Sequence, residues 1–272
     1  MPEIAEVRTV AKTLNERIVG RKIVGVDTPF DKIIEGDKKE FIKEVTNSYI
    51  TTVGNYGKWI FITLSDKTIM AHLRMEGKFF IKPQSDEISK HEHIIFHLDD
   101  GNDLRYHDVR KFGKMILVNT NEIYKAKEIS KLGIEPDNKA LTKEYIYENI
   151  KNKKLPIKTV LLDQTIINGL GNIYADEVLF KSGINPLRKA DSITLDECEK
   201  IKNSASVIIE KATKMGGTTI RSYTSSLGVY GSYQSELKVH TKQGSPCQIC
   251  NTEIKKTRVG GRGTYYCPKC QK

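Results

Sequence analysis

Hydrophobic positions recur with two different spacings along the chain. Near the N-terminus they repeat every three to four residues through Val7–Leu14, which predicts a helix. Between residues 22 and 118, short β-branched and aromatic runs are separated by Gly, Asp and Asn, which is typical of antiparallel strands. These runs are Lys22–Val26, Ile50–Val53, Trp59–Leu64, Thr68–His72, His93–Leu98, Leu104–His107 and Lys114–Val118. Residues 1–118 are therefore predicted to form an antiparallel β-sandwich with an N-terminal helix, including a hairpin turn at Asp99–Asn102.

Beyond residue 140 the hydrophobic spacing becomes helical. The preceding polar stretch, 119–140, contains one Gly and one Pro and is predicted to be a linker. Helices are predicted over Leu141–Lys151, Ile157–Gln164, Ile173–Lys181 and Thr194–Met215. Gly216 and Gly217 end the last helix, and a loop rich in Gly, Ser, Thr and Tyr follows. The expected fold is a multidomain α+β protein, divided into a β-sandwich (1–118), a linker (119–140), a helical domain (141–237) and a small terminal unit (238–272).

Charge narrows the choice of partners. The 272 residues include 44 Lys and Arg against 34 Asp and Glu, a net charge of +10. Residues 1–118 carry 19 basic and 18 acidic side chains, whereas residues 119–272 carry 25 and 16. This surplus favours a polyanionic partner such as nucleic acid. No apolar run approaches the roughly 18 residues of a membrane span. Because the N-terminus also lacks a secretion signal, we expect a cytoplasmic protein, nucleoid-associated in a bacterium, with no membrane partner.

Four of the five cysteines lie in the basic tail. They form two C-x-x-C pairs, separated by sixteen residues, and each pair can direct two thiolates toward one point. Two disulfides or two redox pairs are the alternatives, but disulfides are disfavoured without a secretion signal. We therefore expect one structural Zn²⁺, bound by Cys247, Cys250, Cys267 and Cys270. The metal would stabilise a 35-residue unit that has little hydrophobic core of its own.

The first residues offer a candidate nucleophile. A small second residue favours removal of Met1, which would expose Pro2 as a free secondary amine. An α-amine is far less protonated at neutral pH than Lys, and it can attack an aldehyde-like carbon to form an iminium. Glu3 beside it could move protons. The alternative is an ordinary helix start, in which Pro and Glu only favour the first turn.

Six motifs follow one another along the chain. They are Met1-Pro2-Glu3-x-x-Glu6-Val7, Tyr56–Trp59, His72–Gly77, Leu104–Gly113, Leu161–Gln164 with Gly169–Ala175, and Gly261–Gln271. Together they resemble the motifs of the formamidopyrimidine-DNA glycosylases, and the resemblance spans essentially the whole chain. It implies a β-sandwich, a helix–two-turn–helix domain and a zinc finger. It also implies an enzyme that excises 8-oxoguanine and formamidopyrimidines and then cuts the strand by β- and δ-elimination, with no organic cofactor.

The resemblance implies a chemical role for four residues. Pro2 would attack the anomeric carbon of the damaged nucleotide, and Glu3 would protonate the sugar ring oxygen. Lys58 would bind a phosphate and assist the eliminations, although it could also be a solvated lysine before an apolar strand. Arg262 would grip phosphates around the lesion and donate a proton late in strand cleavage.

Further positions are similar to the DNA contacts of the family. They are His72, His91, Arg110, Lys153 and Asn172. The glycines before Asn172 would let a phosphate approach the start of the next helix. Asn172 could equally be a plain N-cap.

An enzyme that extrudes a base from a duplex must fill the void that the base leaves. The resemblance assigns this task to Met75, Arg110 and Phe112, with core packing as the alternative for Met75 and Phe112. Arg110 would suit lesions opposite cytosine. The flipped base would be recognised by Glu6 and by the loop near 216–233, in particular Ile220, Arg221, Ser222 and Tyr223.

The chain departs from the family pattern at two positions. Ala5 stands where the family usually has Pro, which makes the placement of Glu6 less secure. Arg8 stands where Glu is common, and it either adds positive charge near DNA or lies on the exposed face of the helix.

Three other functions stay open at the level of sequence. An endonuclease VIII-like enzyme for oxidised pyrimidines would share Pro2, Glu3 and the finger, but it would fill the void differently. A non-catalytic lesion-binding protein would bind DNA without turnover, and a zinc-ribbon RNA-binding protein would explain only the tail. The main expectation is a monomeric glycosylase and lyase that acts on damaged double-stranded DNA.

Overall fold

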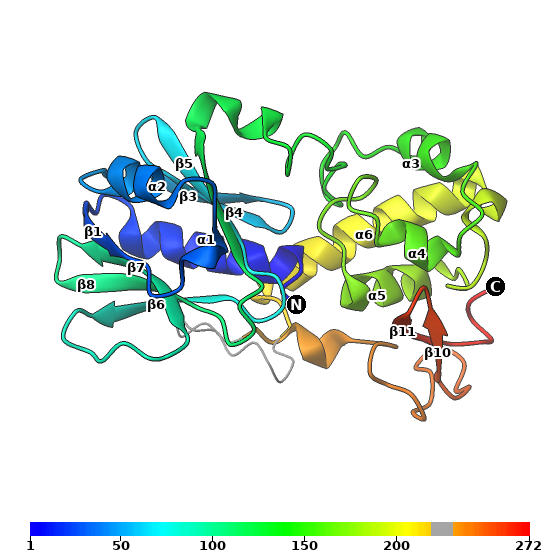
Figure 1. Ribbon diagram of the computed structural model, residues 1–272. Helices are drawn as coiled ribbons and strands as arrows, with labels where there is room; N and C mark the ends of the chain where they lie inside the picture. The colour runs from blue at the N-terminus through cyan, green and yellow to red at the C-terminus, as the bar shows by residue number, and fades with distance from the viewer. Residues whose placement is uncertain (219–230) are drawn as a thin grey trace. The chain divides into compact units, whose positions relative to one another are not determined.

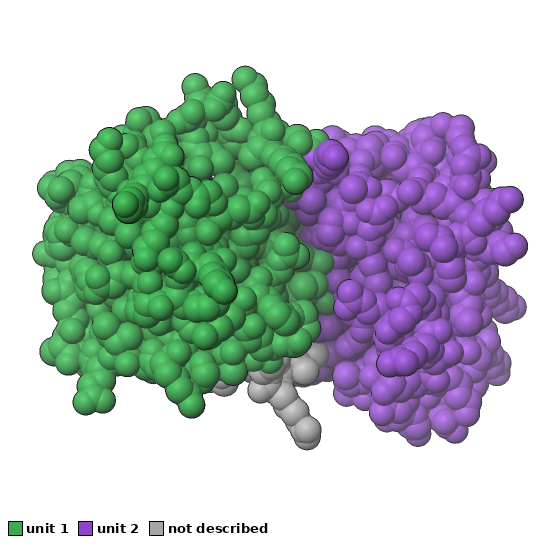
Figure 2. Space-filling model, viewed as in Figure 1, with its two compact units in different colours: residues 1–130, 216–231 green, residues 131–215, 232–272 purple. Residues whose placement is uncertain are grey.

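The computed structural model describes residues 1–218 and 231–272 and divides into two compact units (Figure 1, Figure 2). The first unit comprises Met1–Ser130 together with 216–218 and residue 231. The second comprises Lys131–Met215 and Ser232–Lys272, so the cysteine-rich tail groups with the helices. The boundary after Ser130 falls within the stretch expected to be a linker. The finer division into four segments stays a prediction.

Two β-sheets form most of the first unit (Figure 1). The four-stranded sheet, in the order β1-β7-β8-β6, is antiparallel throughout and contains β1 (Ile23–Asp27), β6 (Lys78–Pro83), β7 (Glu92–Leu98) and β8 (Asn102–His107). The five-stranded sheet, in the order β2-β9-β5-β4-β3, contains β2 (Ile34–Glu35), β3 (Thr52–Tyr56), β4 (Trp59–Thr63), β5 (Lys67–His72) and β9 (Lys114–Asn119). Short β2 pairs in parallel with β9. The predicted β fold and the turn between β7 and β8 are confirmed, whereas β2, β6 and helix α2 (Lys38–Val45) were not predicted.

One apolar cluster joins both sheets to helix α1 (Ile4–Ile18). Alternate strand residues such as Ile60 and Phe96 are fully buried in it, and α1 adds side chains at helical spacing. The predicted N-terminal helix is confirmed, and it is longer at both ends than its apolar spacing indicated. It begins after Glu3, whose amide donates to a Glu6 carboxylate oxygen at 2.9 Å, as in a capping box.

Four helices form most of the second unit. They are α3 (Lys143–Ile150), α4 (Ile157–Leu161), α5 (Asn172–Ser182) and α6 (Leu195–Lys214). All four were predicted, but α4 ends three residues earlier than expected. The Gln164 amide explains this end, because it donates to the carbonyls of Leu162 and Leu170, both at 2.9 Å, and closes a loop instead of extending the helix. Gly216 and Gly217, both at positive φ, follow α6 as predicted.

The C-terminal tail forms a small hairpin, β10 (Lys255–Val259) with β11 (Arg262–Tyr266), and β11 packs against α5. Short 3₁₀ turns complete the chain at η1 (Asp31–Ile33), η2 (Thr120–Lys125), η3 (Ala190–Ser192) and η4 (Tyr233–Glu236). Among the described residues, no helix is long and apolar enough to cross a membrane.

Candidate active site and nucleic-acid interface

The N-terminal residues predicted to carry the chemistry are buried where α1 begins. Pro2 is buried, and Glu3 and Glu6 are 3% and 4% exposed. The second oxygen of the Glu6 carboxylate accepts from the amide and the hydroxyl of Thr218, at 2.7 and 3.0 Å. These hydrogen bonds hold Glu6 firmly, although Ala5 stands where Pro was expected. Glu6 therefore links the candidate nucleophile to the segment that leads into 219–230.

Lys58 and His72 lie at the adjoining ends of β4 and β5, where Trp59 pairs with His72. Lys58 is only 6% exposed, which excludes the solvated-lysine alternative. The Arg74 amide donates to His72 Nδ1 at 3.0 Å. Burial, together with the positive charges of Arg74 and Lys58, lowers the pKa of His72 to about 3. His72 is therefore a neutral imidazole that offers Nε2–H as a hydrogen-bond donor.

The candidate void-filling side chains lie on two turns that connect the sheets. Met75 is half-buried in the turn between β5 and β6. Phe112, in the turn between β8 and β9, is 54% exposed, and the Arg110 guanidinium lies 4.8 Å from its ring centre. Core packing is therefore excluded for Phe112. The two turns meet at Tyr106, whose hydroxyl lies against both Gly77 and Gly113.

His91 ends the loop before β7, and a residue that the sequence did not single out holds this loop. His91 is half-buried, with its ring 5.6 Å from that of His107. Arg105 is fully buried and donates to Glu92 at 3.2 Å and to Asp103 at 3.0 Å. It also donates to the loop carbonyls of Pro83, Asp86 and Glu87. In the sequence, the one indication of this role is that an arginine stands inside a predicted apolar strand.

In the second unit, Asn172 and the tip of the finger are connected. Gly171 is the N-cap of α5 and Asn172 is its first helical residue, so the N-cap alternative for Asn172 is wrong. The Asn172 amide donates instead to the carbonyl of Gly263, at 3.0 Å. Arg262, the preceding residue, is exposed at the start of β11. The structure thus brings together two candidate phosphate contacts that lie 90 residues apart in the sequence.

A buried ionic network supports this connection. Lys158 is fully buried; its ammonium lies 2.7 Å from Asp176 and donates to the Gly263 carbonyl at 2.9 Å. The Asp176 carboxylate also binds His240 Nδ1, at 2.7 Å. Glu177 accepts three backbone amides from 238–240, and burial raises its pKa. The sequence does not point to these residues by a motif; their only local signal is that they are charged residues within apolar helical segments.

Lys153 is less firmly held than the other candidate contacts. Its ammonium lies 3.8 Å from Asp163, and both side chains are about two-fifths exposed. Such a surface pair contributes little to stability, so the Lys153 charge is available to a phosphate.

The four tail cysteines converge as predicted. Their sulfur atoms lie within 4.8 Å of one another, with 3.9 Å between Cys247 and Cys270 and 3.4 Å between Cys250 and Cys267. A tetrahedral shell with Zn–S bonds of about 2.3 Å requires sulfur atoms roughly 3.8 Å apart, so the four thiols fit Zn²⁺. Cys198 lies outside this cluster, in α6, where burial raises its pKa to about 12. It is an inert thiol.

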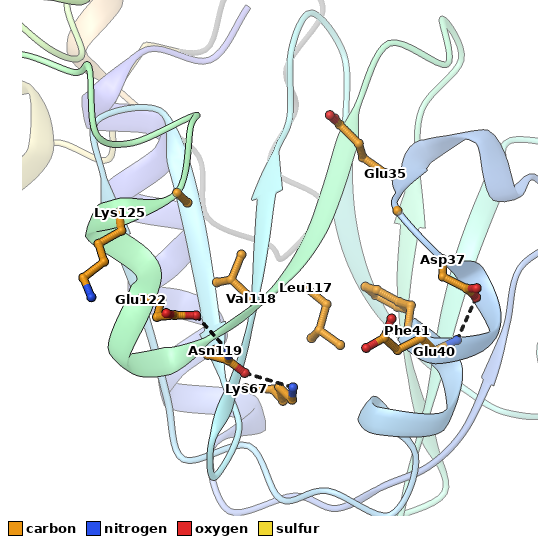
Figure 3. A pocket seen from close by; sticks show the side chains of 12 residues that line it. Glu35, Asp37, Glu40, Phe41, Lys67, Leu117, Val118, Asn119, Glu122 and Lys125 are labelled. Atoms are coloured by element: carbon orange, nitrogen blue, oxygen red, sulfur yellow. Dashed lines mark hydrogen bonds between the residues drawn. The ribbon is translucent and has the colours of Figure 1, made fainter.

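The lesion-recognition residues Ile220, Arg221, Ser222 and Tyr223 lie outside the described residues. A pocket of about 530 Å³ in the first unit, between α2, β9 and η2, contains none of the predicted site residues that the structure describes (Figure 3). Two of its polar side chains already bind Asn119, Lys67 at 2.9 Å and Glu122 at 2.8 Å. This pocket is therefore not the candidate site.

Known protein families match this chain along most of its length, in the same order as its motifs. Three family models match: the formamidopyrimidine-DNA glycosylase N-terminal domain over 1–115, its H2TH domain over 132–224, and a zinc finger found in FPG and IleRS over 244–272. The formamidopyrimidine-DNA glycosylase of Lactobacillus delbrueckii subsp. bulgaricus is 42% identical over 100% of both chains. That of Bacillus anthracis is 43% identical over 100% of this chain and 99% of its own.

Solved structures agree with these relatives. A mutant of the Lactococcus lactis protein, in complex with DNA containing Fapy-dG, matches with a TM-score of 0.95 and 35% identity over 100% of both chains. A complex of the Lactococcus lactis protein with DNA containing an abasic site matches with a TM-score of 0.94 and 35% identity over 99% of both chains. The chain belongs to the formamidopyrimidine-DNA glycosylase family, as the order of its motifs predicts.

Proposed function

We propose that this chain is a bifunctional DNA glycosylase and AP lyase of base excision repair, which removes 8-oxoguanine and formamidopyrimidines from double-stranded DNA. The observation that carries the proposal is the buried Pro2-Glu3 pair at the start of α1, with Glu6 held beside it. Family membership over the full length supports the glycosylase activity. The Lactococcus lactis relative binds DNA that contains Fapy-dG or an abasic site, which supports this substrate class.

The chemistry begins once Met1 is removed and the Pro2 nitrogen becomes a free amine. Its lone pair attacks the anomeric carbon, the glycosidic bond breaks, and the damaged base leaves with the bonding electrons. Glu3 protonates the sugar ring oxygen, so the ring opens and an iminium links Pro2 to the sugar. The β- and δ-eliminations then expel the two phosphates, assisted by Lys58 and Arg262.

Other residues bind and deform the DNA. Neutral His72 donates Nε2–H to a phosphate, and His91, Lys153 and Asn172 contact the backbone. Met75, Arg110 and Phe112 occupy the void, while Glu6 and the loop that includes Ile220–Tyr223 recognise the flipped base. Four thiolates around Zn²⁺ leave no open position for water, so the metal stabilises the finger and takes no part in catalysis. We expect the enzyme to act as a monomer in the cytoplasm, close to the nucleoid in a bacterium.

Borohydride trapping tests this proposal. The mature protein, with Met1 removal verified by mass spectrometry, is incubated with a duplex carrying 8-oxoguanine opposite cytosine or one carrying an oxidised pyrimidine. We expect an adduct through Pro2 that forms more strongly on the first duplex. Stronger trapping on the pyrimidine would indicate an endonuclease VIII-like specificity. Binding without an adduct on either duplex would indicate a lesion-binding protein that is not an enzyme.

A further inference from the structure

One buried carboxylate shapes the turn between β8 and β9. Asp108 has no exposed surface, and its Oδ1 accepts from the Arg110 amide at 3.0 Å. Its Oδ2 accepts from the amides of Phe112 and Gly113, at 2.9 and 2.8 Å. The backbone from 110 to 113 therefore wraps around a single side chain. Since a carboxylate only accepts hydrogen bonds, all three amides are satisfied at once.

The backbone of Asp108 extends the same support to the neighbouring loop. Its amide donates to the His91 carbonyl at 3.0 Å, and its own carbonyl accepts from His93 Nε2 at 2.8 Å. Lys111, within the turn, has a φ of 57°, a left-handed conformation that is uncommon for a residue other than glycine. The turn therefore depends on contacts outside itself to keep its shape.

Tyr106 connects this turn to the one that carries Met75. Its ring is 1% exposed, and its hydroxyl lies 3.5 Å from Asp108 Oδ2. A Cβ atom at Gly113 or Gly77 would overlap the Tyr106 hydroxyl. Neither glycine has a left-handed φ, so glycine is needed at both positions for space and not for backbone conformation. One hydroxyl therefore fixes how closely both turns approach the core.

We propose that Asp108, together with Tyr106, is a positioning residue that holds Arg110, Phe112 and Met75 in a single arrangement before DNA binds. This inference rests on the proposed function, because it assumes that these side chains fill the void beside a flipped base. Asp108 is buried and acts only through the turn. Asparagine in its place turns an NH₂ group toward at least one of the three amide donors, so the turn loses part of its support.

The experiment compares two reactions of the mature enzyme. Excision of 8-oxoguanine from a duplex requires base extrusion and a filled void, whereas strand cleavage at an abasic site in single-stranded DNA requires neither. We expect D108N to slow duplex excision in single-turnover experiments by about 10–100-fold and to leave single-strand cleavage at the wild-type rate. The matched control is D99N, an exposed aspartate in the turn between β7 and β8, which should change neither rate.

A second pair of variants keeps the inference testable if D108N folds poorly. G113A forces a methyl group against Tyr106, whereas G54A places the same group in open space on β3. We expect G113A to lower duplex excision selectively and G54A to have no effect. The inference would be overturned if D108N and G113A excised 8-oxoguanine from the duplex at the wild-type rate, or if they lost the same rate on both substrates. A wild-type protein that is inactive on both substrates would instead refute the proposed function.

Discussion

The two units support the groups proposed to contact DNA in different ways. In the first unit, the turns that carry Met75 and Phe112 rest on a cluster of 25 buried apolar residues shared by α1 and both sheets. In the second, the finger that carries Arg262 contributes to a cluster of five buried residues, two of which are the cysteines Cys247 and Cys267. The finger is also supported by buried polar groups of α4 and α5, among them Lys158, which pairs with Asp176 and donates to the Gly263 carbonyl.

This difference separates two sources of stability. A large apolar core stabilises the sheets without help from a ligand, because its contribution grows with the apolar area removed from water. The finger removes little apolar area and depends on coordination and buried charge, which are lost when one partner is removed. Removing the metal or the Lys158 charge should therefore destabilise the second unit and leave the first intact.

Metal removal should have the largest effect. Structural Zn²⁺ contributes on the order of 10 kcal/mol to the folding of small zinc domains, so chelation should unfold the finger. We expect DNA binding, followed by fluorescence anisotropy, to be lost and to return when Zn²⁺ is added back. Calorimetry on the same samples should still show the unfolding transition of the first unit. Tight DNA binding by the metal-free protein would show that the finger does not need its metal.

Replacement of Glu3 by Gln should have the next largest effect, and this effect should be confined to the first unit. Loss of a general acid typically lowers the rate by about 10²–10⁴-fold, so E3Q should slow base excision by that order. Binding to DNA with an uncleavable abasic-site analogue should stay unchanged. E16Q, an exposed glutamate on the same helix, is the matched control. An excision rate for E3Q within threefold of the wild-type rate would remove Glu3 from the mechanism.

Lys158→Met tests the ionic support of the finger. The variant leaves the Asp176 carboxylate buried without its ammonium partner, which typically costs about 3–5 kcal/mol. We expect a lower denaturation midpoint for the second unit only, measured with the metal bound. The double variant K158M/D176N should recover part of the loss, because no unpaired charge is then buried. Equal stability of K158M and the wild type would show that coordination alone holds the finger.

The sequence indicated those features whose signal is local. The apolar run Trp59–Leu64 predicted β4, and the spacing of the cysteines predicted a converging cluster that the structure confirms. Strand β6 was not predicted because its short apolar centre is flanked by lysines and the strand ends in proline. Helix α2 was not predicted because only two of its eight residues are buried, which gives a weak apolar pattern. Both elements depend on tertiary contacts more than on their own pattern.

The features that the sequence could not indicate are pairings between distant residues. Lys158 meets the Gly263 carbonyl across 105 residues, and Asn172 meets the same atom across 91. Local rules made Asn172 a possible N-cap, but its amide has a partner that exists only in the folded second unit. Asp108 is a different case, because its three amide partners lie only two to five residues away, but the Leu104–Gly113 motif does not indicate the turn that brings them to one carboxylate.

A pH titration also tests the difference between the two units, and its expected effect is the smallest. Burial lowers the pKa of His97, but its hydrogen bonds to Asp103 and Asp27, at 2.7 and 3.1 Å, outweigh this and raise it above the ordinary value of 6.5. A group with a raised folded-state pKa stabilises the protein fully below its unfolded pKa, and this contribution is lost as the pH rises through the folded value. The first unit should therefore lose about 1 kcal/mol or less between pH 6 and pH 9 through this group.

The finger should respond in the opposite direction. Acid protonates the thiolates that bind the metal, so its stability falls as the pH is lowered. Within the first unit, the lowered pKa values of His72, His93 and His107 act against His97, because the unfolded chain takes up protons there that the folded chain does not. The contribution of His97 is therefore measured as the difference between the wild type and H97Q, with calorimetric midpoints followed from pH 5.5 to 9. H97Q should make the first midpoint rise more steeply with pH and leave the second unchanged. If the midpoint of the first transition depends on pH in H97Q as it does in the wild type, other groups cause the pH response of the first unit. His97 would then contribute nothing to its stability beyond the apolar core.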